Sequence, residues 1–130
     1  LNLSCNNIQR SGGFQVAALI TGCCSLRALR LWDNDIDTEG AICIATALHS
    51  NSTLRLLSLD HNKIGPIGGS ELAFALSLNS TLTELTLQGN DIDVRDLDSI
   101  EEGCQRNRIH FINELRLSET YKPLEFQSFE

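Results

Sequence analysis

Proline is nearly absent from this chain of 130 residues, which has two, and no stretch resembles a proline- or serine-rich linker. No apolar run approaches the ~20 residues of a membrane span, so we expect no membrane partner. Positive charge is also scarce, because 10 lysines and arginines stand against 17 aspartates and glutamates, a formal net charge of −7. This balance argues against a broad basic surface for nucleic acid. What the chain does have is 42% hydrophobic residues, enough for one domain with a core.

The five cysteines are an odd number, and none of them is spaced as a CxxC pair. That pattern fits neither a disulfide framework nor a zinc site, and it favours reduced thiols and a cytoplasmic location. Three glycosylation sequons, at Asn2, Asn51 and Asn79, are the evidence for a secreted protein instead. Asn51 and Asn79 lie 28 residues apart, however, which suggests a structural reason for both.

The pattern LxLxxNxI occurs four times, and its first leucines are Leu1, Leu29, Leu57 and Leu85. Each start lies 28 residues after the one before it. Four occurrences in strict phase are strong evidence for a repeat architecture. Between them, apolar residues recur at i, i+1, i+3 and i+4, which is one face of an amphipathic helix. Each unit is therefore predicted to be a short strand, a turn, a helix and a return loop.

The spacing changes after the fourth unit. The next LxL pair is Leu115 and Leu117, and it begins 30 residues after Leu85. Repeat arrays end in atypical units. We therefore predict repeats over residues 1–117, with starts at 1, 29, 57, 85 and 115, and a C-terminal edge or tail over 118–130.

The first unit begins at Leu1 rather than at a methionine, so we expect the chain to be part of a longer protein. Its strand has no preceding unit in this sequence to cover Leu1, Leu3 and Ile8. Uncovered strand edges and repeat faces invite association. The isolated chain is therefore expected to self-associate through this N-terminal edge.

These motifs resemble the leucine-rich repeat family, and within it the ribonuclease-inhibitor-like class, which has a helix in every unit. The stretch GAICIATALHSNSTLRLLSLDHNKIG looks similar to the repeats of nucleotide-binding leucine-rich-repeat receptors and their stand-alone relatives. The resemblance implies an α/β leucine-rich repeat solenoid, a curved horseshoe segment with about 28 residues per repeat. Its parallel strands would form the concave sheet, and its helices would form the convex surface.

The stretch LWDNDIDTEG has a carboxylate at every second position from Asp33 to Glu39. A calcium loop of the EF-hand type that begins at Asp33 needs glycine at its sixth position and glutamate at its twelfth, but Thr38 and Ile44 stand there. Asn34 fits the repeat asparagine, so we interpret the acidic run as repeat architecture and expect no metal. The three histidines fall at different phases of the repeat, so no acid–base pair should converge. We predict neither catalytic residues nor a cofactor.

Side chains along a strand alternate between its two faces, so the residues of the concave face can be predicted. Trp32 is the only tryptophan, and the alternation puts it on this face rather than in the core. Exposed tryptophan and arginine are enriched in binding hot spots. The alternative is that Trp32 packs sideways against Leu56 and Arg30 without a partner. The predicted protein-binding residues are Trp32, Arg30, Asp60, Ser58, Leu56, Gln88, Glu84 and Arg116.

We therefore predict a non-enzymatic protein–protein interaction module or scaffold in the cytoplasm, with another protein as its partner. One alternative, suggested by the resemblance, is a regulator of a GTPase similar to the activator of Ran. Those proteins carry a strongly acidic tail after their repeats, and the ending SETYKPLEFQSFE is not one. A second alternative is a permanent structural subunit of a cytoskeletal or ciliary assembly, which the sequence does not separate from a transient adaptor.

Overall fold

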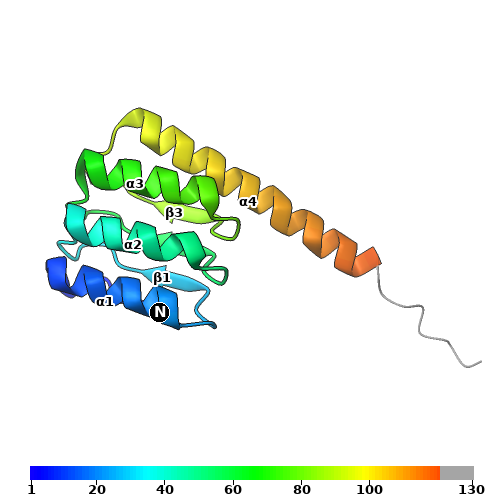
Figure 1. The fold of residues 1–130 in the computed structure, drawn as a ribbon, viewed down its shortest axis with the longest axis horizontal. Coiled ribbons are helices and arrows are strands. Elements are labelled where there is room, and N and C mark those ends of the chain that lie inside the picture. The colour runs from blue at the N-terminus through cyan, green and yellow to red at the C-terminus, as the bar shows by residue number, and fades with distance from the viewer. Residues whose placement is uncertain (121–130) are drawn as a thin grey trace, which may run out of the picture.

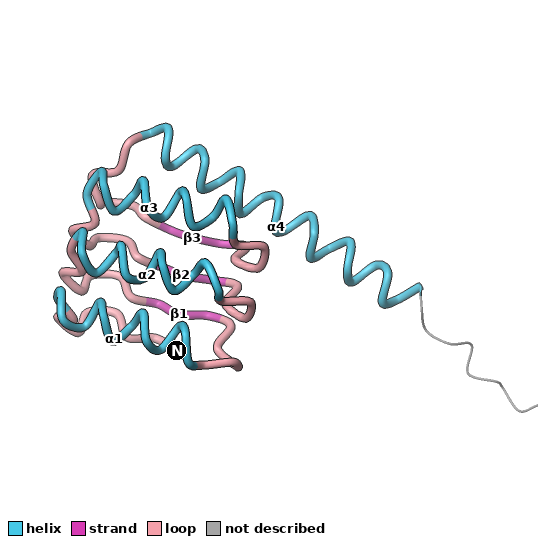
Figure 2. The backbone as a smooth tube through the Cα atoms, viewed as in Figure 1, coloured by secondary structure: helices cyan, strands magenta, loops and turns pink. Residues whose placement is uncertain are grey.

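Helices and strands alternate along residues 1–120, the part of the chain that the computed structural model describes (Figure 1). The helices are α1 (Gln9–Gly22), α2 (Thr38–Ser50), α3 (Gly65–Leu78) and α4 (Val94–Thr120). The strands are β1 (Ala28–Arg30), β2 (Leu56–Ser58) and β3 (Glu84–Thr86), which form one parallel sheet in the order β1-β2-β3. Helices α1, α2 and α3 each join two neighbouring strand positions, so the units stack side by side (Figure 2).

The 28-residue period sets the register of the sheet. Leu29 pairs with Leu57, and Leu57 pairs with Leu85. The first unit continues the sheet, because the Arg30 N–H donates to the Leu1 carbonyl at 2.9 Å and the Leu3 N–H donates to the Arg30 carbonyl at 2.8 Å. The predicted period and parallel pairing are confirmed.

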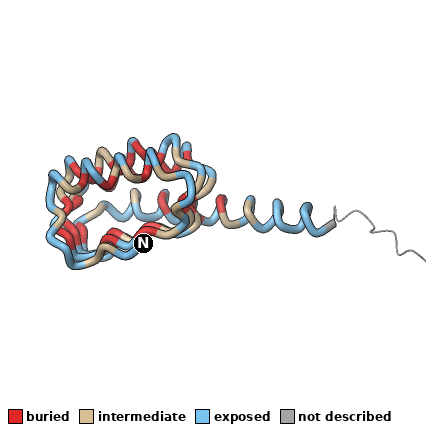
Figure 3. Tube along the Cα trace, turned by 90° about the horizontal axis from the view of Figure 1, so that it is seen from below, coloured by how far each residue is buried: buried red, intermediate tan, exposed pale blue. Residues whose placement is uncertain are grey.

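The core lies between the sheet and the helices, where the buried positions of both layers face each other (Figure 3). Leu29, Leu57 and Leu59 are fully buried from the strand side, as are Ile44 and Leu72 from the helix side. Neighbouring strands are ~4.8 Å apart and packed helices ~8–10 Å apart, so the stack must bend with its sheet inside. The predicted leucine-rich solenoid, with a concave sheet and convex helices, is confirmed.

The repeat asparagines form a ladder where the strands end. The Asn62 amide donates to the carbonyls of Leu31 at 3.0 Å and Leu59 at 2.9 Å. Its Oδ1 accepts from the backbone N–H groups of Asn34 at 3.1 Å and Ile36 at 3.0 Å. Each rung therefore satisfies backbone groups of its own unit and of the preceding one, which an amide can do because it both donates and accepts.

The sequon asparagines belong to the return loops. Asn79 is 2% exposed, and its amide donates to the Leu48 carbonyl at 2.8 Å. Its Oδ1 accepts from the N–H groups of Thr81 at 2.9 Å and Leu82 at 2.8 Å. Asn51 makes the corresponding bonds one unit earlier. The 28-residue spacing of these two asparagines therefore has a structural cause, the turn after each helix.

The aspartates of the acidic stretch each have a structural role. Asp33 and Asp35 adopt left-handed backbone conformations, with φ of 56° and 54°, which aspartate tolerates better than most residues. Asp37 is the N-cap of α2, because its Oδ1 accepts from the Gly40 N–H at 3.0 Å. Asp35 also pairs with Lys63 at 2.8 Å. Turn geometry and helix capping thus account for these three carboxylates.

The predicted fifth unit is wrong. Leu115 and Leu117 lie within α4 rather than on a strand, and both are exposed. The cause is Asn107, which stands 28 residues after Asn79 but is not followed by the serine and threonine that form the earlier turns. The Asn107 amide still donates to the carbonyls of Asn79 at 3.0 Å and Leu82 at 2.9 Å. It makes these bonds from within the helix, so the chain does not turn back toward the sheet.

Helix α4 instead lies across the end of the stacked units (Figure 3). It packs against both α3 and β3, and it buries Ile100 and Cys104 there. The Arg106 guanidinium donates to the Leu76 carbonyl at 2.6 Å, and that of Arg108 donates to the Thr83 carbonyl at 2.8 Å. These bonds fix α4 to the last complete unit.

Candidate protein-binding face

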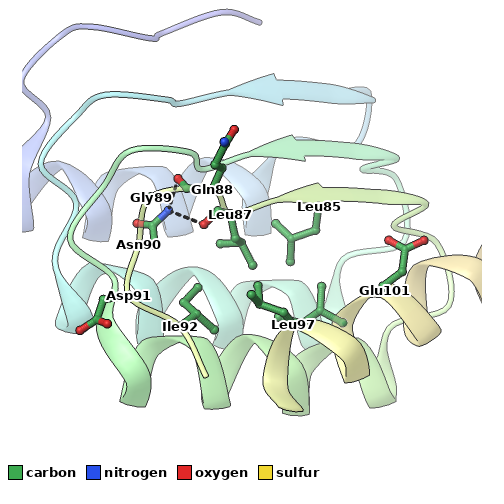
Figure 4. A pocket seen from close by; sticks show the side chains of 10 residues that line it. Leu85, Leu87, Gln88, Gly89, Asn90, Asp91, Ile92, Leu97 and Glu101 are labelled. Carbon is green, nitrogen blue, oxygen red and sulfur yellow. Dashed lines mark hydrogen bonds between the residues drawn. The ribbon is translucent and has the colours of Figure 1, made fainter. Parts of the chain in front are cut away.

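The concave face consists of the strand side chains that point away from the helices. Figure 4 shows this alternation in the last unit, where Leu85 and Leu87 point toward the helix layer and Gln88 points away from it. In β1, the buried Leu29 is followed by the exposed Arg30 in the same way. The sheet register then places residues that are 28 apart on neighbouring strands, in columns across the face.

Trp32 occupies one of these columns and is 42% exposed. Its backbone is held by both neighbouring units. The Trp32 carbonyl accepts from the Cys5 N–H at 3.0 Å in the preceding unit, and the Asp33 N–H donates to the Asp60 carbonyl at 3.0 Å in the following one. Arg30, two residues earlier, is exposed on the same face. A large aromatic side chain therefore stands on a fixed backbone beside a cation.

Asp60 has a structural role in addition to the partner contact predicted for it, which stays a prediction. Its Oδ2 accepts from the hydroxyls of Ser58 at 3.0 Å and Thr86 at 2.5 Å, and its Oδ1 accepts from the Gln88 N–H at 2.7 Å. Burial of the carboxyl is the largest single influence and acts to raise its pKa. Hydrogen bonds from Thr86, Gln88 and Ser58 outweigh it, so the pKa of Asp60 lies below its ordinary value. The carboxylate ties β2 to β3 and makes this part of the face rigid.

The structure brings together all the predicted binding residues except Arg116. Ser58 and Leu56 are half-buried on β2, and Glu84 and Gln88 are exposed in the next unit. Arg116 is exposed on α4, far along the helix from the strands, so its predicted position on the concave face is wrong. The cause is the fifth strand, which does not form.

Sequence reasoning missed two groups near the face. The first is Thr86, whose hydroxyl completes the Asp60 network, and its position 26 residues after Asp60 could have suggested a neighbouring strand. The second is the pair of Arg55 and Phe111, in which the guanidinium lies 4.4 Å from the ring centroid. A cation over an aromatic face is attractive. No sequence pattern indicated this pair, because the predicted repeat start at 115 implied a return loop where Phe111 lies within α4.

A family model for the leucine-rich repeat matches residues 22–45, 50–73 and 78–100, more than half of the chain. The chain belongs to the leucine-rich repeat family. No curated protein matches this leucine-rich repeat chain by sequence.

Two solved structures have a similar fold. One is the actin-binding site 2 of leiomodin-1, with a TM-score of 0.80 and 23% identity, covering 91% of this chain and 68% of that one. The other is the tropomodulin C-terminal domain of Caenorhabditis elegans, with a TM-score of 0.76 and 17% identity, covering 90% of this chain and 70% of that one. At these identities the similarity shows the fold alone. The predicted likeness to nucleotide-binding receptor repeats stays a prediction.

One hollow of this leucine-rich repeat module has a volume of about 460 Å³ and lies between the last turn of the sheet and α4 (Figure 4). Its lining is mainly apolar, and Glu101 is one of only two carboxylates in it.

Within residues 1–120, no group of three or more histidine, cysteine, aspartate or glutamate side chains is placed to hold a metal ion. None of the helices in that part of the chain is long and apolar enough to cross a membrane.

Proposed function

We propose that this chain is a non-enzymatic protein-binding module and that its partner docks on the concave face. The observation that carries the proposal is Trp32, a tryptophan that is 42% exposed on a strand surface between Arg30 and Asp60. Tryptophan and arginine are the residue types most enriched in interface hot spots. A leucine-rich core does not need a tryptophan at this position, so a partner is the simplest reason for its exposure.

The rigidity of the face supports the same proposal. Asp60 is held by three hydrogen bonds, two of which come from Thr86 and Gln88 in the next unit. A surface that is already ordered loses little conformational entropy when a partner binds, so more of the contact energy appears as affinity. We assign Asp60 a positioning role within the face, and we assign the direct contacts to Trp32, Arg30 and Leu56.

The test begins with affinity purification of partners on the tagged chain, followed by binding measurements on each purified partner. Trp32→Ala is expected to weaken binding by ~2 kcal/mol or more, about thirtyfold in affinity. The matched control is Phe14→Ala, which removes an equally exposed aromatic side chain (46%) from α1 on the convex side. If the control weakened binding and Trp32→Ala did not, the concave-face proposal would have to be abandoned.

A second candidate function is binding to actin, as part of a cytoskeletal assembly. It is favoured by the similarity in fold to a domain described as an actin-binding site of leiomodin-1 and to a tropomodulin domain. Co-sedimentation with actin filaments and titration of fluorescent monomeric actin would test it. Binding to actin that is lost in Trp32→Ala would identify actin as the partner of the concave face. If the chain bound neither filaments nor monomers, the actin-binding proposal would be rejected.

We also propose that the protein acts in the cytoplasm. Asn79 is buried and hydrogen-bonded through its amide, so a glycan could not be attached there without opening the return loop. Together with the odd number of cysteines, this favours a reducing compartment over the secretory pathway. Expression in secretory cells tests it, since glycosylation at Asn79 in the folded protein would count against the proposal.

A further inference from the structure

Helix α4 covers only part of the end of the sheet. Seen along the stack, it lies between the helix layer and the strand layer (Figure 3). There the Thr83 carbonyl accepts from the Arg108 guanidinium at 2.8 Å, and the Leu85 N–H lies against the Cys104 thiol. Inside the array the next unit supplies such partners, since the Arg55 carbonyl accepts from the Thr83 N–H at 2.9 Å. Side chains of α4 thus replace a fifth unit along the first part of β3.

The stretch after β3, which we call the open edge (residues 87–92), lacks such partners. In the described part of the chain, four of its backbone N–H groups donate to no acceptor, namely those of Leu87, Gly89, Asn90 and Ile92. Leu87 and Asn90 are only 6% and 3% exposed, so water has little access to them. An N–H group that is buried without an acceptor costs free energy. The open edge is therefore short of hydrogen-bond acceptors.

One unit earlier, the equivalent four donors are all satisfied by the next unit. The Leu59 N–H donates to the Thr86 carbonyl at 2.9 Å. The His61 N–H donates to the Gln88 carbonyl at 2.7 Å. The N–H groups of the ladder asparagine and of the residue two further on both donate to the Asn90 Oδ1, at 3.1 Å and 3.4 Å. A segment with two carbonyls two residues apart, followed by an asparagine, thus satisfies all four donors at once.

An apolar hollow lies beside the open edge. It is the hollow of about 460 Å³ between the last turn and α4, and the side chains that point into it include those of Leu87, Ile92 and Leu97 (Figure 4). Inside the array the corresponding space is filled, because Leu57 has Leu85 of the next unit as its partner in the sheet. Apolar side chains at alternate positions of an extended segment would fill the hollow in the same way.

A complete repeat unit does not fit at the open edge. Each unit inside the array packs its helix beside the helix before it (Figure 2). Helix α4 leaves that layer and crosses the end of the stack, so the helix of an added unit would collide with it (Figure 3). An extended segment without a helix needs only the space between the last turn and α4. The geometry therefore favours a strand-forming peptide over a second copy stacked end to end.

We propose that the open edge binds an extended peptide of another protein that carries the pattern LxLxxN and pairs parallel to β3. Its leucines fill the hollow, and its carbonyls accept from the N–H groups of Leu87 and Gly89. Its asparagine accepts from those of Asn90 and Ile92. Addition of a strand to a sheet edge combines main-chain bonds for affinity with side-chain pockets for specificity. An antiparallel segment would place its asparagine toward α4, away from these two donors, so the parallel direction is selected.

A cation directly after the asparagine completes the match. Asp91 is exposed at the open edge, and among residues 1–120 it has no ion-pair partner. Two units earlier, the equivalent Asp35 pairs at 2.8 Å with Lys63, which directly follows the ladder asparagine of the next unit. The other carboxylate of the hollow, Glu101, is already paired with Arg108. The peptide pattern that fits best is therefore LxLxxNK.

The probe is a fluorescein-labelled peptide, LSLDHNKIG, which has the sequence of residues 57–65 of this chain. Titrated with the full 130-residue chain and followed by fluorescence anisotropy, it should bind saturably. Replacing its asparagine by alanine should weaken binding about tenfold or more, because two donors then lose their acceptor. Replacing its lysine by alanine should weaken binding about twofold to fivefold in the wild type and not at all in Asp91→Asn.

A pair of variants on α4 tests the hollow. Leu97→Glu places a carboxylate in the apolar lining and should weaken binding of the peptide about tenfold or more. The matched control is Val94→Glu, which adds the same charge three residues earlier on the same helix, at an exposed position outside the hollow. Circular dichroism of both variants verifies that the fold is retained. Trp32→Ala should leave the affinity unchanged, so this proposal is tested independently of the concave face.

Amide hydrogen exchange followed by NMR locates the bound peptide. At saturation the four unpaired N–H groups of the open edge should exchange at least about tenfold more slowly, whereas the equivalent groups one unit earlier should not change. Equal affinity for the asparagine and alanine peptides, or no saturable binding, would overturn the proposal. Protection at Leu3 or Trp32 instead of the open edge would also overturn it. So would protection of the open edge that rises with the concentration of the chain alone, because a second copy would then be the occupant.

Discussion

Replacing Asn62 by alanine should destabilise the protein more than almost any other single polar change. The side chain is 6% exposed, and its amide donates to three carbonyls, of which the third is that of Asp60 at 3.2 Å. Its oxygen accepts from the N–H groups of Asn34 and Ile36, both of which are buried. Alanine would leave these two donors without a partner, at about 1–3 kcal/mol each, so we expect a loss of about 2–6 kcal/mol.

The matched control is Asn6→Ala. Asn6 occupies the same position in the first unit, but it is exposed, and within residues 1–120 its oxygen accepts no hydrogen bond. Its loss should cost about 1 kcal/mol or less, because water can reach the carbonyls of Leu3 and Ser4. The comparison separates the cost of losing an asparagine from the cost of losing the two acceptor bonds.

Urea unfolding followed by circular dichroism would measure both values by linear extrapolation. A slope of ~1–3 kcal/mol per molar turns a loss of this size into a midpoint shift of about 1 M or more. If Asn62→Ala and Asn6→Ala were equally mild, the ladder would not contribute to stability, and the reasoning from buried backbone donors would be refuted.

Further predictions concern the core, pH, thiol reactivity and metal. Leu59→Ala should destabilise by ~2–5 kcal/mol in the same assay, because Leu59 is fully buried and the change leaves a cavity. The pKa of Asp60 is lowered on folding, so the ionised carboxylate stabilises the folded protein at neutral pH. This stabilisation is lost as the pH falls below the pKa of the unfolded state, about 4. The difference in free energy of unfolding between the wild type and Asp60→Asn should therefore become smaller at low pH. Burial raises the pKa of the Cys104 thiol to about 11, so iodoacetamide should label the exposed Cys24 well before Cys104 in mass spectrometry of the native protein. Millimolar calcium or a chelator should leave the melting temperature unchanged, and a rise of several degrees with calcium would contradict the structural account of the acidic turns.

The repeat units could be predicted because burial itself is periodic in this fold. A leucine such as Leu57 pairs with the equivalent leucines of the preceding and the following unit, so the same residue type recurs every 28 positions. The same periodicity gave the exposed positions, including that of Trp32. It could not give the Asp60 network, because a half-buried aspartate next to a serine and a threonine has no distinctive sequence pattern.

Helix α4 could not be predicted from the repeat pattern for a related reason. Leu115 and Leu117 look like a strand pair, but a single LxL without its asparagine is weak evidence. The decision between turn and helix depends on tertiary bonds, such as those from Asn107 to the last return loop. The helical period of Ile100 and Cys104 was visible in the sequence, but the continuation of the helix past its usual length had no local marker.

The asparagine ladder also bears on how such a chain can change its length over evolution. The bond from the Asn34 N–H to Asn62 and the bond from the Asn62 N–H to Asn90 join the same atoms, one unit apart. If the block of residues 29–56 were deleted, Asn6 would meet Asn62, which offers the same oxygen that Asn34 now offers. A block of 28 residues can therefore be lost or duplicated between the ends without leaving a rung of the ladder unmatched, whereas a block one residue longer or shorter would break the match at the junction. The number of repeat units therefore does not affect the hydrogen bonds of the ladder. Selection on that number acts only through the surfaces that the units expose.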